Sequence, residues 1–349
     1  MGYILIILFL SCLVGVLFTS NSPKTQKNIY IILGGVLVIL SIFIDKTALP
    51  DYATYLIYLR SDYVWIEPSF IAIRWLVNNL FAGNPIFLFA IYILLGIIIK
   101  LYSINNLTNL ILLSLMLYIC SYWTYHELIQ IRAGVASSLL LLSIKPLYER
   151  DKMRFFTICV VALVFHFSAI MMFGFWLIRN KISEVSRIAY LCLIPISMLL
   201  YILDLDFIAI LKYLPIPVIQ DKIIGYSSLS AYSADRGLVS ASEYNPFITW
   251  NLIKVIAVYY IWLNMNRITR HNKYVVLLLK LQTIGLSLLW LFGSIPVFAT
   301  RGSELITIVQ IILIPLSVYT IKQRLIGCII PVLYGITWII WNITSFSLI

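Results

Sequence analysis

The sequence predicts an all-α polytopic membrane protein, and three observations indicate that fold class. Hydrophobic residues make up 62% of the 349 residues and charged residues only 11%, which is too little polar surface to cover a soluble globule. Apolar runs long enough to cross a bilayer as helices, about 20 residues each, recur along the chain. Most charged residues lie between these runs. We therefore expect about ten full transmembrane helices in one transmembrane domain over residues 1–349.

The expected helices follow the apolar runs in chain order. The run 2–19 has no basic residue before it and no small-residue cleavage pattern after it, so we interpret it as a retained helix and not as a signal peptide. The other runs are 29–45, 84–101, 109–126, 128–144, 188–204, 247–264, 274–292, 303–320 and 325–345. The five cysteines lie in apolar stretches without CxxC spacing, so packing is their expected role.

Residues 155–178 are apolar but do not fit a full span. Basic residues flank this stretch on both sides, within 145–154 and within 179–187. The positive-inside rule places such loops in the cytoplasm, whereas a single crossing would carry one of them outside. We therefore expect a pair of half-helices that turn at residues 165–168 and return to the same side.

The other basic clusters extend this orientation along the chain. The residues expected in cytoplasmic loops include Lys24, Lys27, Lys100, Arg267, Arg270, Lys273, Lys322 and Arg324. The two longest polar segments, about 46–83 and 205–246, are then external loops. The net charge of +11 is a signal of orientation, and binding of nucleic acid is not implied. The cytoplasmic loops carry no Gly-rich phosphate-binding motif, so we expect the chemistry to face outward.

The first external segment combines aromatic rings with carboxylates. The residues that we single out there are Asp51, Tyr52, Tyr55, Trp65 and Glu67. Rings stack on the apolar faces of sugars, and carboxylates hydrogen-bond to sugar hydroxyls, so a sugar-binding site is one interpretation. An interfacial aromatic belt with solvated acids is the other.

Three ionisable residues stand out in or beside apolar helices. Arg132 enters a helix of small residues, where an arginine costs roughly 2.5–3.5 kcal/mol and faces either a cavity with an anionic partner or the interface. His166 lies at the expected turn between the half-helices, as a hydrogen-bonded core residue or as a catalytic group. Arg301 lies at the outer end of a helix and, together with Arg132, predicts a clamp for a phosphate group.

Metal chemistry has little support in the sequence. The spacing of Asp204 and Asp206 suits a metal-binding pair, but no further ligands cluster near them. We therefore expect no metal and no cofactor.

The order of these features resembles the EpsG/Wzy-like family of O-antigen and exopolysaccharide polymerases. The matching pieces are Asp51 with Tyr55, then Glu67, residues 130–136, residues 166–169, and Arg301 before an apolar helix that ends at Ile314-Pro315. They span about residues 51–315. The Arg-x10-Gly pattern of some O-antigen polymerases is absent, because Ser143 and Ile312 stand at the glycine positions.

The resemblance implies a GT-C-like glycosyltransferase of the bacterial plasma (inner) membrane, with its active site facing the periplasm or the cell exterior. Its donor and acceptor would be polyprenyl-diphosphate-linked oligosaccharides in the lipid bilayer, and a chain-length regulator is a candidate partner. Carried over by residue, the resemblance makes Arg132 and Arg301 diphosphate-binding, and His166, Asp51 and Glu67 catalytic. Tyr52, Tyr55 and Trp65 would contact sugar.

Three other functions fit parts of the sequence. A glycan ligase would use the same donor with a different acceptor. A lipid-linked glycan flippase or transporter would show charges along the middle of several helices or an internal repeat, and the sequence suggests neither. A membrane acyltransferase would use His166 as its base but would need a route to an acyl donor.

Overall fold

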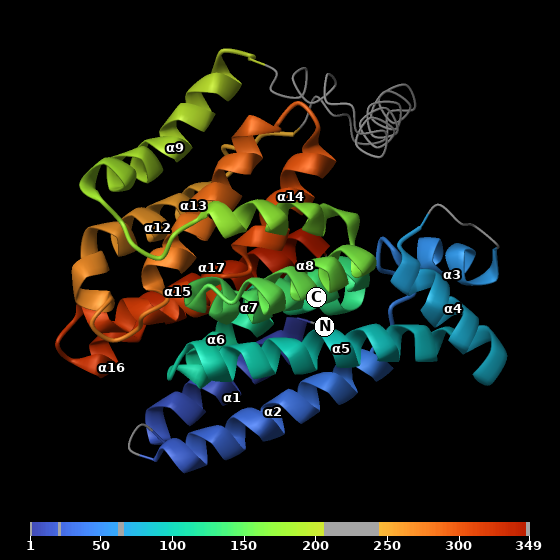
Figure 1. The fold of residues 1–349 in the computed structure, drawn as a ribbon. Coiled ribbons are helices and arrows are strands. Elements are labelled where there is room, and N and C mark those ends of the chain that lie inside the picture. Colours follow the sequence, from blue (N-terminus) through green and yellow to red (C-terminus); the bar gives the residue numbers. More distant parts are fainter. Residues whose placement is uncertain (1, 20–21, 62–65, 206–243, 347–349) are drawn as a thin grey trace. The chain divides into compact units, whose positions relative to one another are not determined.

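The computed structural model describes residues 2–19, 22–61, 66–205 and 244–346 (Figure 1). Over these ranges the protein is all-helical, and six helices are long and apolar enough to cross a membrane. The predicted all-α membrane fold is therefore confirmed, whereas about ten spans and the GT-C likeness stay predictions. Most of the external segment expected at 205–246 lies outside the described residues.

The chain divides into two compact units. Unit 1 comprises residues 1–180, 264–277 and 308–349, and unit 2 comprises 181–263 and 278–307. The prediction of one transmembrane domain stays a prediction.

Unit 1 holds most of the described helices. They are α1 (Gly2–Phe18), α2 (Pro23–Phe43), α3 (Tyr52–Arg60), α4 (Pro68–Leu80), α5 (Pro85–Leu107), α6 (Ile111–Tyr118), the π-helix η1 (Ile119–Ile129), α7 (Ile131–Glu149), α8 (Lys152–Phe165), the 3-10 helix η2 (Phe167–Leu177), α15 (Gln310–Leu313), the 3-10 helix η4 (Pro315–Thr320), α16 (Arg324–Gly327) and α17 (Ile329–Phe346). Within this unit α7 packs against both α5 and α8 (Figure 1).

Unit 2 contains α9 (Glu184–Ile202) and α14 (Pro296–Thr307), together with most of α12 (Thr249–Ile268) and α13 (Val275–Leu291). The Trp262 indole in α12 donates to the Thr283 hydroxyl in α13 at 3.0 Å. The Lys280 ammonium donates to the carbonyl oxygen of Lys181 at 2.8 Å. These bonds join α13 to α12 and to the segment before α9.

Local sequence explains where several helices begin. Ser22 precedes Pro23 at the start of α2, and Asn84 precedes Pro85 at the start of α5. In each case the side chain accepts a hydrogen bond from a first-turn N–H group, and proline has no N–H group to leave unsatisfied. Asp151 caps α8 in the same way.

The predicted turn at residues 165–168 is confirmed. Helix α8 ends at Phe165, His166 has an extended backbone, and η2 continues from Phe167. The two halves pack as a hairpin, because the guanidinium of Arg150 donates to the carbonyl oxygens of Trp176 at 2.6 Å and Ile178 at 2.5 Å. The beginning of α8 and the end of η2 therefore lie at the same end of unit 1, as the flanking basic residues had indicated.

One sequence-based expectation is wrong and another is refined. The segment 46–83, expected as an external loop, contains two helices, α3 and α4, and its external location stays a prediction. Lys100 is not in a loop, because α5 continues to Leu107 and buries this side chain completely. The expected helix ended at residue 101, directly after this lysine, since an unpaired charge within an apolar helix is costly.

Candidate functional site

Glu67 lies at the junction between α3 and α4, where its side chain is turned into unit 1. Pro68 starts α4, and the Glu67 carboxylate does not cap the helix. It instead pairs with the Arg132 guanidinium through Oε2 and with His166 Nδ1 through Oε1, the second contact at 3.1 Å. We name these three side chains the Glu67 cluster. All three are residues that the sequence analysis had selected, from segments up to 99 positions apart.

The geometry fixes the ring of His166. An ionised carboxylate can only accept hydrogen bonds, so Nδ1 of His166 must be the donor to Glu67. A neutral imidazole that is protonated at Nδ1 has Nε2 as its proton acceptor. The pair is therefore arranged as in active sites where a carboxylate orients a histidine base.

The charges around Glu67 determine its protonation. Burial by itself raises the pKa of the Glu67 carboxyl, but the hydrogen bond from His166 and the positive charge of Arg132 outweigh burial and lower the pKa to about 2. Glu67 is thus a carboxylate at neutral pH and a weak base. Its chemistry suits orientation of His166 better than removal of a proton from a sugar hydroxyl.

Arg132 occupies the first turn of α7, and aromatic rings surround its guanidinium. The rings of Tyr55, Tyr58 and Phe70 have their centroids 5.5, 5.8 and 5.9 Å from its Cζ atom. The side chain is 17% exposed, and its Nε makes no hydrogen bond to any described residue. Arg132 therefore keeps a donor beyond its contact with Glu67. Sequence analysis had selected neither Tyr58 nor Phe70, because ring packing around a cation depends on how α3 and α4 fold.

The other predicted site residues lie apart from this cluster or beyond what is described. Tyr52 stacks on Phe89 with centroids 5.4 Å apart, and the carboxylate of Asp51 makes no hydrogen bond or ion pair with a described residue. Trp65 lies outside the described residues. Arg301 lies in α14 of unit 2, and its pairing with Arg132 in unit 1 stays a prediction.

A second buried cluster was missed. The Lys100 ammonium in α5 donates to Oε1 of Glu127 at 2.7 Å and to the carbonyl oxygen of Gly134 at 2.7 Å. The hydroxyl of Tyr118 donates to the same carboxylate oxygen at 2.7 Å. We name Lys100, Glu127 and Tyr118 the Glu127 cluster. Its sequence signal was Lys100 near the end of the run 84–101 and Glu127 between the runs 109–126 and 128–144. The expectation that charges avoid the middle of helices is wrong here.

The two clusters are linked through the junction of η1 and α7. Glu127 lies near the end of the π-helix, Gln130 breaks the helical geometry, and Arg132 follows two residues later. A Cβ atom at Gly134 would lie 2.1 Å from the carbonyl oxygen of His126, so this close approach requires glycine. Lys100 spans the junction and thereby fixes the backbone that carries Arg132.

The comparisons with known proteins agree with the resemblance. The model of the EpsG family matches residues 27–348, nearly the whole chain. No curated protein and no solved structure matches the chain.

Proposed function

The chain belongs to the EpsG family, and from that premise we propose that it is a polysaccharide polymerase of the bacterial plasma membrane. It joins polyprenyl-diphosphate-linked oligosaccharide repeat units by glycosyl transfer. The observation that carries the proposal is the Glu67 cluster, in which one carboxylate orients a histidine and holds an arginine.

His166 is the proposed proton acceptor. With Nδ1–H held by Glu67, its Nε2 takes the proton from the attacking hydroxyl of the acceptor sugar. The new glycosidic bond forms to the anomeric carbon of the donor as the bond to the diphosphate oxygen breaks. Asp51 and Tyr52, at the start of α3, are proposed to contact the acceptor. Tyr55 and Trp65 are proposed to contact sugar rings.

Arg132 is the proposed contact for the diphosphate leaving group. That group gains negative charge as the glycosidic bond breaks, and a fixed guanidinium in a mostly buried site stabilises the charge. Its exposed fraction of 17% supports this role. Arg301 is proposed as a second diphosphate contact, and a chain-length regulator as a partner.

The length of α7 supports an outward-facing site. Arg132 is in its first turn, and Arg150 caps its other end, 18 residues later. A helix rises about 1.5 Å per residue, so these two residues are roughly 27 Å apart along the axis. With Arg150 and the basic residues around it in the cytoplasm, Arg132 is near the outer surface.

A flippase is the second candidate, and the buried Lys100–Glu127 pair favours it, since intramembrane charges often mark transport pathways.

A polymerase and a flippase give different products. A polymerase makes longer glycans from lipid-linked repeat units in detergent, where transport has no meaning. A ligase transfers a glycan once and makes no ladder.

The test uses purified protein with lipid-linked repeat units and resolves glycan length on a gel. We expect a ladder from the wild type and its loss in His166→Ala, with unchanged thermal stability. His271→Ala is the matched control, since that exposed ring stacks on Tyr319 at 4.2 Å away from the cluster. A full ladder from His166→Ala would remove His166 from the mechanism, and no ladder from the wild type would refute polymerisation.

A further inference from the structure

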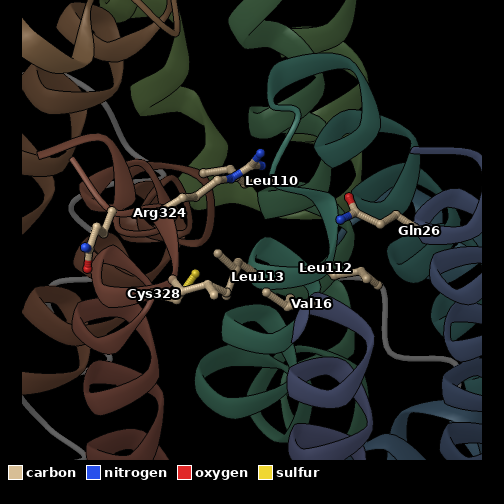
Figure 2. Close-up of a pocket in the computed structure, with 9 residues that line it drawn as sticks. Val16, Gln26, Leu110, Leu112, Leu113, Arg324 and Cys328 are labelled. Atoms are coloured by element: carbon tan, nitrogen blue, oxygen red, sulfur yellow. The ribbon is translucent and has the colours of Figure 1, made fainter. Parts of the chain in front are cut away.

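Unit 1 contains a cavity of about 470 Å³ whose lining includes no member of either buried cluster. Figure 2 shows the residues that line it. Val16 of α1, Gln26 of α2, Leu112 and Leu113 of α6, and Arg324 of α16 contribute to its lining. In Figure 2, Val16, Leu112 and Leu113 lie between Arg324 on one side and Gln26 on the other. The cavity therefore has mostly apolar walls with one cation and the amides of Gln26 and Gln323, which is the composition of a site for an amphiphilic ligand.

The cavity lies at the opposite end of α5 from the Glu67 cluster. Ser69, two residues after Glu67, approaches the Tyr92 hydroxyl of α5 at 3.5 Å. Leu110 lines the cavity and follows the end of α5 at Leu107. From Tyr92 to Leu107 the helix rises roughly 22 Å, at about 1.5 Å per residue. The cavity is thus not part of the proposed active site.

Four segments of unit 1 that include the cavity lining carry only basic residues among their charged groups. Residues 1–44, 101–126, 264–277 and 308–349 contain seven Lys and Arg and no Asp or Glu. Two bonds bring their loops together: Arg267 donates to the carbonyl oxygen of Thr320 at 3.3 Å, and Asn272 donates to that of Leu107 at 2.7 Å. A ligand that is bound here meets more basic than acidic side chains, with Glu149 as a carboxylate that lines a neighbouring pocket together with Leu107.

Arg324 is the cation at the cavity itself. Its guanidinium makes no hydrogen bond or ion pair with a described residue, whereas Arg267 nearby in the fold is held by a backbone carbonyl. Gln26 uses its amide nitrogen on the carbonyl oxygen of Thr19, at 3.1 Å. Arg324 is therefore the group that can receive an anion.

We propose that this cavity binds an anionic phospholipid, with the phosphate on Arg324 and an acyl chain along Val16, Leu112 and Leu113. Basic pockets between helices on the cytoplasmic side of membrane proteins attract anionic head groups, and apolar walls hold the chain. The apolar side chains of the wall disfavour a purely ionic ligand. The positive charge of Arg324 disfavours a neutral lipid. The proposal does not depend on the reaction at the Glu67 cluster.

The test is native mass spectrometry of the purified full-length protein with added phosphatidylglycerol, and with phosphatidylcholine of the same acyl chains as the zwitterionic probe. We expect selective retention of phosphatidylglycerol. Arg324→Gln should lower its apparent affinity by about tenfold, since a hydrogen bond to a charged group is worth at least one decade. Arg324→Lys should keep most of the binding, and Lys322→Gln, a charge removed two residues away, should stay close to wild type.

Several outcomes would overturn the proposal. Equal retention of both lipids by the wild type would exclude charge selection, whatever the behaviour of the variants. Unchanged affinity in a folded Arg324→Gln protein would exclude this cavity. Displacement of the lipid by inorganic phosphate would indicate a phosphate site, and stronger retention of a polyprenyl phosphate than of phosphatidylglycerol would indicate a substrate-lipid site.

Discussion

The Glu67 and Glu127 clusters of unit 1 each pair a carboxylate with a cation, but their side chains are buried to different degrees. In the Glu127 cluster both charges are sealed, with Lys100 0% and Glu127 1% exposed, and the ammonium has two acceptors. A Cβ atom at Gly96 would come within 2.5 Å of the Glu127 carboxylate, so no space is left there for a ligand. In the Glu67 cluster, Arg132 is partly exposed and keeps a donor.

This difference separates a structural role from a chemical one. A buried ion pair whose partners are all satisfied holds helices in register and is expensive to break. A carboxylate that orients a histidine and an arginine beside an opening can act on a ligand without loss of the fold. Variants of the sealed cluster should therefore lose stability first, and variants of the open cluster should lose activity first.

The largest effect is expected from Lys100→Met. It leaves the Glu127 carboxylate buried without its ammonium partner, which should cost about 3–5 kcal/mol of folding free energy. The measurement is thermal unfolding of the protein in detergent. Lys100→Met combined with Glu127→Gln should recover part of the loss, because no uncompensated charge remains. A wild-type melting temperature for the single variant would show that the pair does not hold α5 to η1 and α7.

The next effect is expected from Glu67→Gln. The amide cannot hold His166 and Arg132 as an ionised carboxylate does, so the rate of polymer formation should fall by about 100-fold, as is usual for loss of acid–base catalysis. The melting temperature should change less than in Lys100→Met. Initial rates and melting curves on the same preparations separate the two effects. A stability loss as large as that of Lys100→Met would make the Glu67 cluster structural too.

A smaller effect is expected from Arg301→Lys in α14. Lysine keeps the charge but cannot bridge two phosphate oxygens with a planar fork, so polymer formation should fall by about tenfold. Arg270→Lys, in the loop after α12, is the matched control. An unchanged rate in Arg301→Lys would exclude a bidentate contact to the diphosphate.

The smallest effect concerns acid stability. The pKa of Glu67 is lowered in the folded protein to about 2 from an ordinary value of 4.5. Its contribution to stability is therefore complete above pH 4.5 and is lost as the pH falls from 4.5 toward 2. Melting temperatures of the wild type and Glu67→Gln should run parallel above pH 5 and converge below 4.5. Curves that stay parallel down to pH 2 would contradict the lowered pKa.

Much of the Glu67 cluster was predictable because each member breaks a rule of its local sequence. Arg132 stands in an apolar helix, His166 stands between two basic flanks that require a turn, and Glu67 lies among aromatic residues before a proline. These features depend on a few neighbouring residues. The positive-inside rule then predicts that all three residues lie at the same end of the protein.

The Glu127 cluster was not predictable in the same way. Lys100 and Glu127 are 27 residues apart, and their contact depends on an 11-residue π-helix for which the sequence gives no periodic signal. The helices α3 and α4 were hidden for a related reason, since their aromatic and polar residues suit a loop until they pack on α5 and around Arg132.

Replacement of Arg132 by lysine tests the central claim most directly, since Arg132 is proposed to hold the diphosphate while it stays paired with Glu67. In purified protein with lipid-linked repeat units, Arg132→Lys should keep its melting temperature and lose most of the polymer, because an ammonium cannot serve both partners in the guanidinium geometry. Arg150→Lys, at the other end of α7, is the control and should keep polymer formation wherever it keeps the fold. A near-normal ladder from Arg132→Lys would contradict the diphosphate role of this residue.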